Sequence, residues 1–95
     1  MEEIKEILSG IKHPEINNSL TELGMIGNIY KNDDAVWVIE LKLPFKEIPI
    51  KDYLIQQIVD ALSPKLTEKF GIMIKEMTQE EREYFMQLSQ QNWAL

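Results

Sequence analysis

The feature that most restricts the fold is a long alternating segment from Ala35 to Leu43, in which every second residue is apolar. A two-residue period of this kind is typical of a β-strand with one buried face. The positions between are Val36, Val38, Glu40 and Lys42, so half of the opposite face is expected to be charged. The chain therefore needs a sheet, together with other elements that cover one face of that sheet.

Two further segments have the period of an amphipathic helix. Apolar residues at positions 4, 7, 8 and 11 predict a helix over residues 2–11. A wider apolar stripe at positions 50, 54, 58, 61 and 62 predicts a second helix between Pro49 and Pro64. Pro49 suits the first helical position, where a missing N–H costs nothing, and Pro64 ends the helix.

The remaining segments predict two strands and one more helix. Residues 23–30 are mostly apolar but contain Gly24 and Gly27, which indicates a short, irregular strand. Residues 32–34 are turn formers, so this strand and the next are expected to pair as an antiparallel hairpin. Residues 70–75 alternate as a third strand. Thr78 and Glu81 have the spacing of a capping box, which predicts a third helix that carries Phe85, Leu88 and Trp93.

The predicted order is helix, strand, strand, helix, strand, helix. We expect a small two-layer α+β domain, with a mixed three-stranded sheet and the helices packed on one face. A length of 95 residues fits a single domain over 1–95 with one hydrophobic core.

The charge balance excludes several classes of function. The formal net charge is −6, and the basic residues are scattered among acidic ones, which disfavours nucleic acids and acidic membrane surfaces as partners. The acidic start at Glu2 and Glu3 differs from a secretory signal, and no apolar run approaches the ~20 residues of a membrane span. We therefore expect a cytoplasmic protein without contact to membranes.

Residues suited to catalysis are scarce. The chain has no cysteine, and His13 is its only histidine. The glycines are isolated, so no phosphate-binding loop is present. His13 and Glu15 offer two metal ligands, but a zinc site needs three or four, and the others are missing. We predict no catalytic residue, no metal and no cofactor, and hence a binding role in place of an enzyme.

The run Ile4–Gly24, followed by the predicted hairpin and the helix after Pro49, resembles the small metal–sulfur cluster biosynthetic family. Relatives in this family include the SufT and PaaD proteins and the N-terminal domains of Mrp/ApbC-type ATPases. The family pattern has a helix, Asp-Pro-Glu, a stretch ending in glycine, a hairpin, a Cys-Pro loop and a second helix. Pro14-Glu15, followed nine residues on by Gly24, is the most specific match.

Two departures from the family pattern affect the interpretation. Asp-Pro-Glu becomes His13-Pro14-Glu15, and Cys-Pro becomes Ile48-Pro49. Thiolates are the usual ligands of iron–sulfur clusters, and isoleucine cannot replace one. The resemblance therefore implies the fold and the cellular setting more than it implies cluster binding. It also implies that two loops lie close together, the one after the first helix and the one after the second strand. The predicted partner-binding residues in these loops are His13, Pro14, Glu15, Pro44, Phe45 and Pro49.

The leading hypothesis is a non-catalytic accessory protein in iron–sulfur cluster assembly or delivery, which docks to a carrier ATPase, a scaffold or a client. One alternative is a PaaD-like maturation subunit for a multicomponent oxygenase. Another is a small-ligand binder or enzyme that uses His13 as its acid–base group. A homodimer also stays open, as does the role of Trp93, which either tucks back onto the domain or meets a partner.

Overall fold

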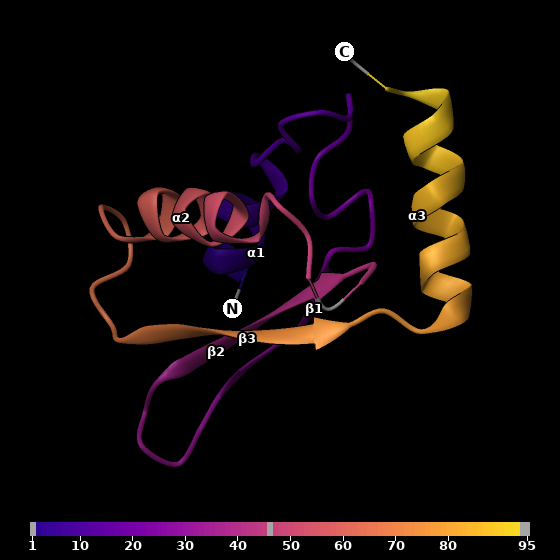
Figure 1. Cartoon of the computed structure of the whole chain (residues 1–95). Helices are drawn as coiled ribbons and strands as arrows, with labels where there is room; N and C mark the ends of the chain where they lie inside the picture. Colours follow the sequence, from indigo (N-terminus) through magenta and orange to yellow (C-terminus); the bar gives the residue numbers. More distant parts are fainter. Residues whose placement is uncertain (1, 46, 94–95) are drawn as a thin grey trace.

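The alternating segment forms the central strand of a three-stranded sheet with the order β1-β2-β3. The structure is a computed structural model that describes residues 2–45 and 47–93. Figure 1 shows the elements in the predicted order. Their bounds are α1 (Glu2–Ser9), β1 (Ile26–Lys31), β2 (Trp37–Leu43), α2 (Lys51–Leu62), β3 (Phe70–Glu76) and α3 (Gln79–Gln91).

The sheet is mixed, as predicted. β2 pairs with β1 in the antiparallel direction and with β3 in the parallel direction. The apolar side of β2 faces the helices, and Ile39, Leu41 and Leu43 have no exposed surface. Burial of three large aliphatic side chains in a row makes this strand the centre of the core.

The turn between β1 and β2 depends on one side chain. Asn32 Oδ1 accepts hydrogen bonds from the backbone N–H groups of Asp34 and Val36, at 2.9 and 3.1 Å. Ala35 has φ 61, a left-handed backbone conformation, and it is exposed. The prediction that Ala35 shares the buried side of the strand is therefore wrong. The turn extends two residues further than expected, to Val36, because Asn32 also caps the N–H of Val36.

β1 is irregular, as the glycines predicted, but it begins at Ile26 and not at Leu23. The preceding residues form a turn in which Gly24 has φ 75, a region that glycine enters without strain. The register between β1 and β2 shifts between Ile26 and Ile29. This irregularity bends the strand and leaves backbone groups without partners in the ladder.

Glu40 fills the space that the irregularity opens. It lies on the face of the sheet away from the helices and is only 4% exposed. Its Oε1 accepts the backbone N–H of Asn28 at 3.1 Å, and its Oε2 lies 3.2 Å from Lys75 Nζ. The hydrogen bond from Asn28 is the main reason that the pKa of Glu40 is lowered, and Lys75 adds to the effect.

Gly27 provides the room for this carboxylate. A Cβ atom at Gly27 would lie only 2.8 Å from Glu40 Oε1 and 2.9 Å from Lys42 Cε. The glycine, the buried acid and the irregular strand therefore form one structural unit.

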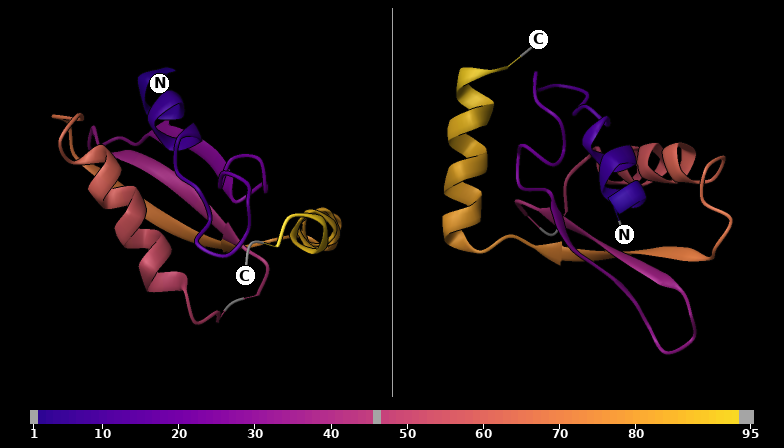
Figure 2. Two further views of the ribbon diagram at one scale, coloured as in Figure 1. Left: turned by 90° about the horizontal axis from the view of Figure 1, so that it is seen from above. Right: turned by 180° about the vertical axis from the view of Figure 1, so that it is seen from behind.

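α1 and α2 cover one face of the sheet, as Figure 2 shows from above. Ile4 and Leu8 of α1 are 1% exposed, and α2 contributes a fully buried stripe in which positions repeat every four residues. That stripe consists of Leu54, Ile58 and Leu62.

The predicted start of α2 needs a correction. The helix begins at Lys51 with Ile50 as its N-cap, so Pro49 precedes the cap and does not occupy the first helical position. The ring of Pro49 still limits the backbone just before the helix, and it lies in the connection that leads from β2.

α3 stands beyond the ends of the strands and rises on the same side of the sheet as the other helices (Figure 1). The predicted capping box is present. The backbone N–H of Glu81 donates to Thr78 Oγ1 at 3.2 Å, and that of Thr78 donates to Glu81 Oε1 at 2.9 Å. Phe85 is the buried residue of this helix. Among residues 2–45 and 47–93, no helix is long and apolar enough to cross a bilayer.

Candidate functional site

Two loops and α3 enclose an apolar pocket of about 280 Å³ at the end of the sheet. The first loop follows α1, and the second connects β2 to α2. Neither loop adjoins the other in sequence, so only the fold brings them together. The lining residues are His13, Glu15, Ile16, Pro44, Phe45, Ile48, Pro49, Ile50, Phe85, Met86, Ser89 and Trp93.

The structure brings together every residue of the predicted site except Pro14. His13, Glu15, Pro44, Phe45 and Pro49 all line the pocket, whereas Pro14 is exposed and lies outside it. Proximity of the two loops, which the family resemblance implied, is therefore an observed feature of this fold. Binding of a partner at these residues stays a prediction.

Backbone hydrogen bonds hold the first loop in a narrow hairpin-like shape. The N–H of His13 donates to the carbonyl of Asn18 at 3.0 Å, and the N–H of Leu20 donates to the carbonyl of Ile11 at 2.9 Å. The hydroxyl of Ser19 accepts the N–H of Glu22 at 3.1 Å, which closes the loop at its far end. These bonds fix the loop without regular secondary structure.

His13 lies inside this loop and is only 7% exposed. Its Nδ1 accepts the backbone N–H of Glu15 at 3.0 Å, so a neutral ring carries its proton on Nε2. The ring lies 6.3 Å from that of Phe85, measured between centroids. Burial lowers the pKa of His13, and the nearby charge of Glu15 opposes this only in part. His13 is thus neutral at pH 7 and supports the wall of the pocket.

Arg82 of α3 holds the second loop. Its Nε donates to the carbonyl of Pro44 at 2.6 Å, and its Nη2 lies 3.3 Å from both the carbonyl of Met77 and Glu76 Oε2. The guanidinium carbon also lies 5.1 Å from the centre of the Phe45 ring. Pro44 is buried, but Phe45 is 48% exposed, so Arg82 presents an aromatic ring at the mouth of the pocket.

The segment after α3 joins the first loop. The N–H of Asn17 donates to the carbonyl of Asn92 at 2.7 Å, and Ile16 and Trp93 form an isolated antiparallel bridge. Trp93 is nevertheless 50% exposed. Its backbone tucks onto the domain, as the first alternative for this residue predicted, while half of its side chain stays exposed, and contact with a partner stays a prediction.

α3 and three isoleucines also line the pocket, although the sequence patterns did not predict their contribution. Phe85, Met86 and Ser89 come from neighbouring positions of one helix, and their spacing was visible in the sequence. The site of contact was not visible, because periodicity identifies a helix face but not the element it packs against. Ile16 lacked any distinguishing signal, whereas Ile48 was noted only as a replacement of cysteine and Ile50 only as part of a helical stripe.

The pocket does not suit an iron–sulfur cluster. Ile48, which the sequence resemblance aligned with a cysteine, presents hydrocarbon to the cavity. In the described ranges 2–45 and 47–93, no group of three or more His, Cys, Asp or Glu side chains is placed to hold a metal ion. A cluster would need thiolate donors from elsewhere.

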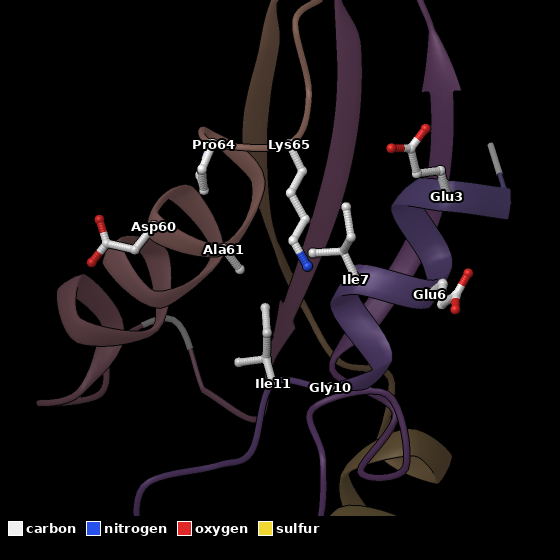
Figure 3. Close-up of a pocket in the computed structure, with 9 residues that line it drawn as sticks. All are labelled: Glu3, Glu6, Ile7, Gly10, Ile11, Asp60, Ala61, Pro64 and Lys65. Carbon is white, nitrogen blue, oxygen red and sulfur yellow. The ribbon is translucent and has the colours of Figure 1, made fainter.

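A larger hollow of about 700 Å³ lies between α1 and the end of α2 (Figure 3). Ile7, Ile11 and Ala61 line its middle, and Lys65 extends toward them. The carboxylates of Glu6 and Asp60 point away from this middle in Figure 3. Its polar groups therefore do not converge on a common point, which makes the smaller apolar pocket the better candidate site.

Comparison with known proteins supports the fold alone. The chain is similar to a solved structure described as a domain of unknown function, DUF59, from Bacillus anthracis. The TM-score is 0.71 at 14% sequence identity, and the match covers 93% of this chain and 90% of that one. No protein-family model matches the sequence, and no curated protein matches it either. The small α+β architecture is thus that of a DUF59 domain.

Proposed function

We propose that this chain is a non-catalytic accessory protein in iron–sulfur cluster assembly or delivery, which acts as an adaptor through the apolar pocket. The observation that carries the proposal is the pocket itself, because it is built from the two loops that the SufT- and PaaD-like resemblance singled out. The DUF59 fold is the architecture that this resemblance implied. In this proposal the protein works in the cytoplasm beside a carrier ATPase or scaffold.

The mouth of the pocket has the composition of a protein contact site. Phe45, Met86 and Trp93 are 48%, 43% and 50% exposed and surround a cavity with an apolar lining. Aromatic side chains beside a desolvated pocket are the usual centres of binding energy at interfaces. We infer that an apolar side chain of the partner enters the cavity and that these three residues close around it.

The charges of the chain restrict the partner further. The net charge is −6, and Glu15 lies among the lining residues. A partner with a basic rim around an apolar anchor would associate faster and in the correct orientation. The same charge balance disfavours an acidic surface as the partner.

The environment of His13 supports a binding role over catalysis. A general base needs a free nitrogen within reach of the substrate. Nδ1 is occupied by the N–H of Glu15, which makes the ring a structural support of the loop. Nε2 keeps a proton in the neutral ring and can only donate.

The test is a binding measurement between the purified chain and purified cluster-assembly proteins from the same genome, starting with an Mrp/ApbC-type ATPase. Phe45→Ala should weaken the complex about 30-fold, the factor that corresponds to a loss of about 2 kcal/mol at an interface centre. Tyr53→Ala is the matched control, because Tyr53 is 55% exposed and lies on α2 outside the pocket.

Two results would count against the proposal in different ways. Equal affinities for Phe45→Ala and Tyr53→Ala would show that the partner binds elsewhere on the surface. Absence of binding to every assembly protein would reject the function.

A second candidate, a small-ligand binder, is favoured by the polar side chains in the wall of the apolar cavity. About 280 Å³ is near the lower end for ligand pockets, and His13 and Ser89 supply polar groups among apolar walls. A screen of small apolar fragments by NMR would detect it through shifts confined to pocket residues. Shifts without any protein partner would make this candidate the better one.

A further inference from the structure

β3 forms one edge of the sheet, and its outer side has no neighbouring strand within the described part of the chain. We propose that two copies of this protein pair there, β3 against β3, in the antiparallel direction. The pairing joins two three-stranded sheets into one continuous sheet. This inference does not depend on the apolar pocket or on the proposed function.

The two edges of the sheet are built differently. The β1 edge is interrupted by the register shift between Ile26 and Ile29, and such bulges hinder the approach of another strand. β3 keeps unbroken register with β2 from Phe70 to Glu76 and contains no proline. A regular edge strand without a bulge or proline is a template for pairing, and the charged residues of β3, Lys75 and Glu76, stand together at its end.

The backbone groups that β3 offers can be identified from its bonds to β2. The N–H of Trp37 donates to the carbonyl of Lys69 at 2.9 Å, and the N–H of Met77 donates to the carbonyl of Leu43 at 2.8 Å. Odd-numbered residues of β3 therefore turn their backbone groups toward β2. The residues whose N–H and C=O groups face outward are Phe70, Ile72, Ile74 and Glu76.

One register suits a symmetric pair best. With the twofold axis at Met73, Ile72 lies opposite Ile74 of the second copy, and Phe70 lies opposite Glu76. All of these residues have outward backbone groups, so each pair exchanges two hydrogen bonds. Gly71 lies opposite Lys75, and a Cβ added at Gly71 would meet nothing within 4 Å, so the long side chain has room.

The neighbouring registers are less favourable. Moving the axis to Ile72 places Lys69 opposite Lys75 of the second copy, and Glu68 opposite Glu76, which sets like charges against each other. Moving it to Ile74 pairs only residues 72–76 of each copy within the strand, whereas the axis at Met73 pairs the whole of β3 from Phe70 to Glu76. The sequence of β3 therefore selects the axis at Met73.

Side-chain exposure agrees with a covered edge. Met73 is 42% exposed and Ile74 is 38% exposed, although both belong to a regular strand. In the proposed pair each Ile74 packs beside Ile72 of the other copy, and the two Met73 side chains meet at the axis. These contacts remove apolar surface from water, which is the main favourable term in association.

Single cysteines give a test that is specific for the register, because the chain has no cysteine of its own. Residues at position 73 form a non-hydrogen-bonded pair with Cα atoms about 4.5 Å apart, within the range of a disulfide. Met73→Cys should therefore give a covalent dimer under mild oxidation. Lys75→Cys is the control. In the proposed register position 75 of one copy lies about 14 Å from position 75 of the other, so these two cysteines should not form a disulfide.

Solution mass, measured by sedimentation over concentrations up to about 500 μM, provides the second measurement, since small interfaces give weak complexes. The wild type should dimerise. Ile74→Lys should stay monomeric with an unchanged circular dichroism spectrum, because two lysines then face apolar neighbours across the edge. Tyr30→Lys on β1 is the matched control, with 40% exposure before substitution, and it should leave dimerisation unchanged. A wild type that stays monomeric, or cross-linking of both cysteine variants alike, would overturn the proposal.

Discussion

Arg82→Ala is the substitution that tests most directly how the pocket is held together. Arg82 donates to the carbonyls of Pro44 and Met77, pairs with Glu76 and lies over the Phe45 ring. Removal leaves the carbonyl of the buried Pro44 without this donor, and an orphaned buried acceptor costs about 1–3 kcal/mol. The partly exposed ion pair with Glu76 adds ~0–1 kcal/mol, and the contact with Phe45 adds about 0.5 kcal/mol.

We therefore expect the free energy of unfolding to fall by about 2 kcal/mol, measured by urea denaturation. Arg82→Lys is the control, because lysine keeps the charge beside Glu76 but has no rigid fork of donors. It should lose most of the same stability. Partner affinity at the pocket should fall with both variants, since Phe45 loses the group that positions it. If both variants unfold within about 0.5 kcal/mol of the wild type, then Arg82 does not organise the loop.

The remaining predictions concern the irregular strand, the histidine and the cluster. Gly27→Ala should destabilise the fold by about 1–3 kcal/mol, because its Cβ would clash with Glu40 and Lys42, whereas Gly71→Ala should be neutral or slightly stabilising; equal thermal midpoints would contradict this. His13 has a pKa that burial lowers from 6.5, so the unfolded chain binds its proton first. Stability should accordingly fall as the pH drops below 6.5 and level off below the folded-state pKa; His13→Asn should flatten this part of the profile, and an NMR titration of the single histidine at or above 6.5 would refute it. Anaerobic incubation with iron and sulfide should leave the isolated chain colourless, because it has no thiolate ligands; a brown protein with stoichiometric iron would show that other side chains can bind the cluster.

The sequence predicted the elements well wherever local chemistry decides them. The period of Ile4 and Leu8 identified α1, and the pair Thr78 and Glu81 located the start of α3. Alternation identified β2 and β3, and the order of elements implied the mixed sheet. These features depend on residues close together in the chain, so a single sequence contains the necessary information.

The errors and omissions arose where distant groups decide the outcome. Ala35 was placed on the strand, but the side chain of Asn32 holds it in the turn. Pro49 was placed inside α2, although Ile50 caps that helix. α3 lies against the pocket partly because Arg82 donates a hydrogen bond to the carbonyl of Pro44. This contact joins residues 38 positions apart, and no periodicity indicates it.

For the candidate site, the resemblance to a family contributed more than the patterns did. The resemblance implied that the loop of His13 and Glu15 lies close to the loop of Pro44 and Phe45. The structure places all four residues around one pocket. Residue patterns alone gave no indication that His13 is buried. In fact His13 is buried, because the loop folds back on itself and α3 covers it.

The parallel pairing of β2 with β3 has a consequence for how the chain acquires its shape. Trp37 pairs with Phe70, so each contact in this ladder closes a loop of 33 residues, whereas β1 and β2 meet across a short turn. Closing the longer loop costs more chain entropy before any contact forms. The hairpin is therefore expected to assemble early and β3 to dock late. Until β3 docks, the backbone groups through which β2 and β3 pair have no partner. A chain caught at that stage exposes β2 as well as β3 to other unfinished copies, so rapid docking of the last strand protects the protein against aggregation.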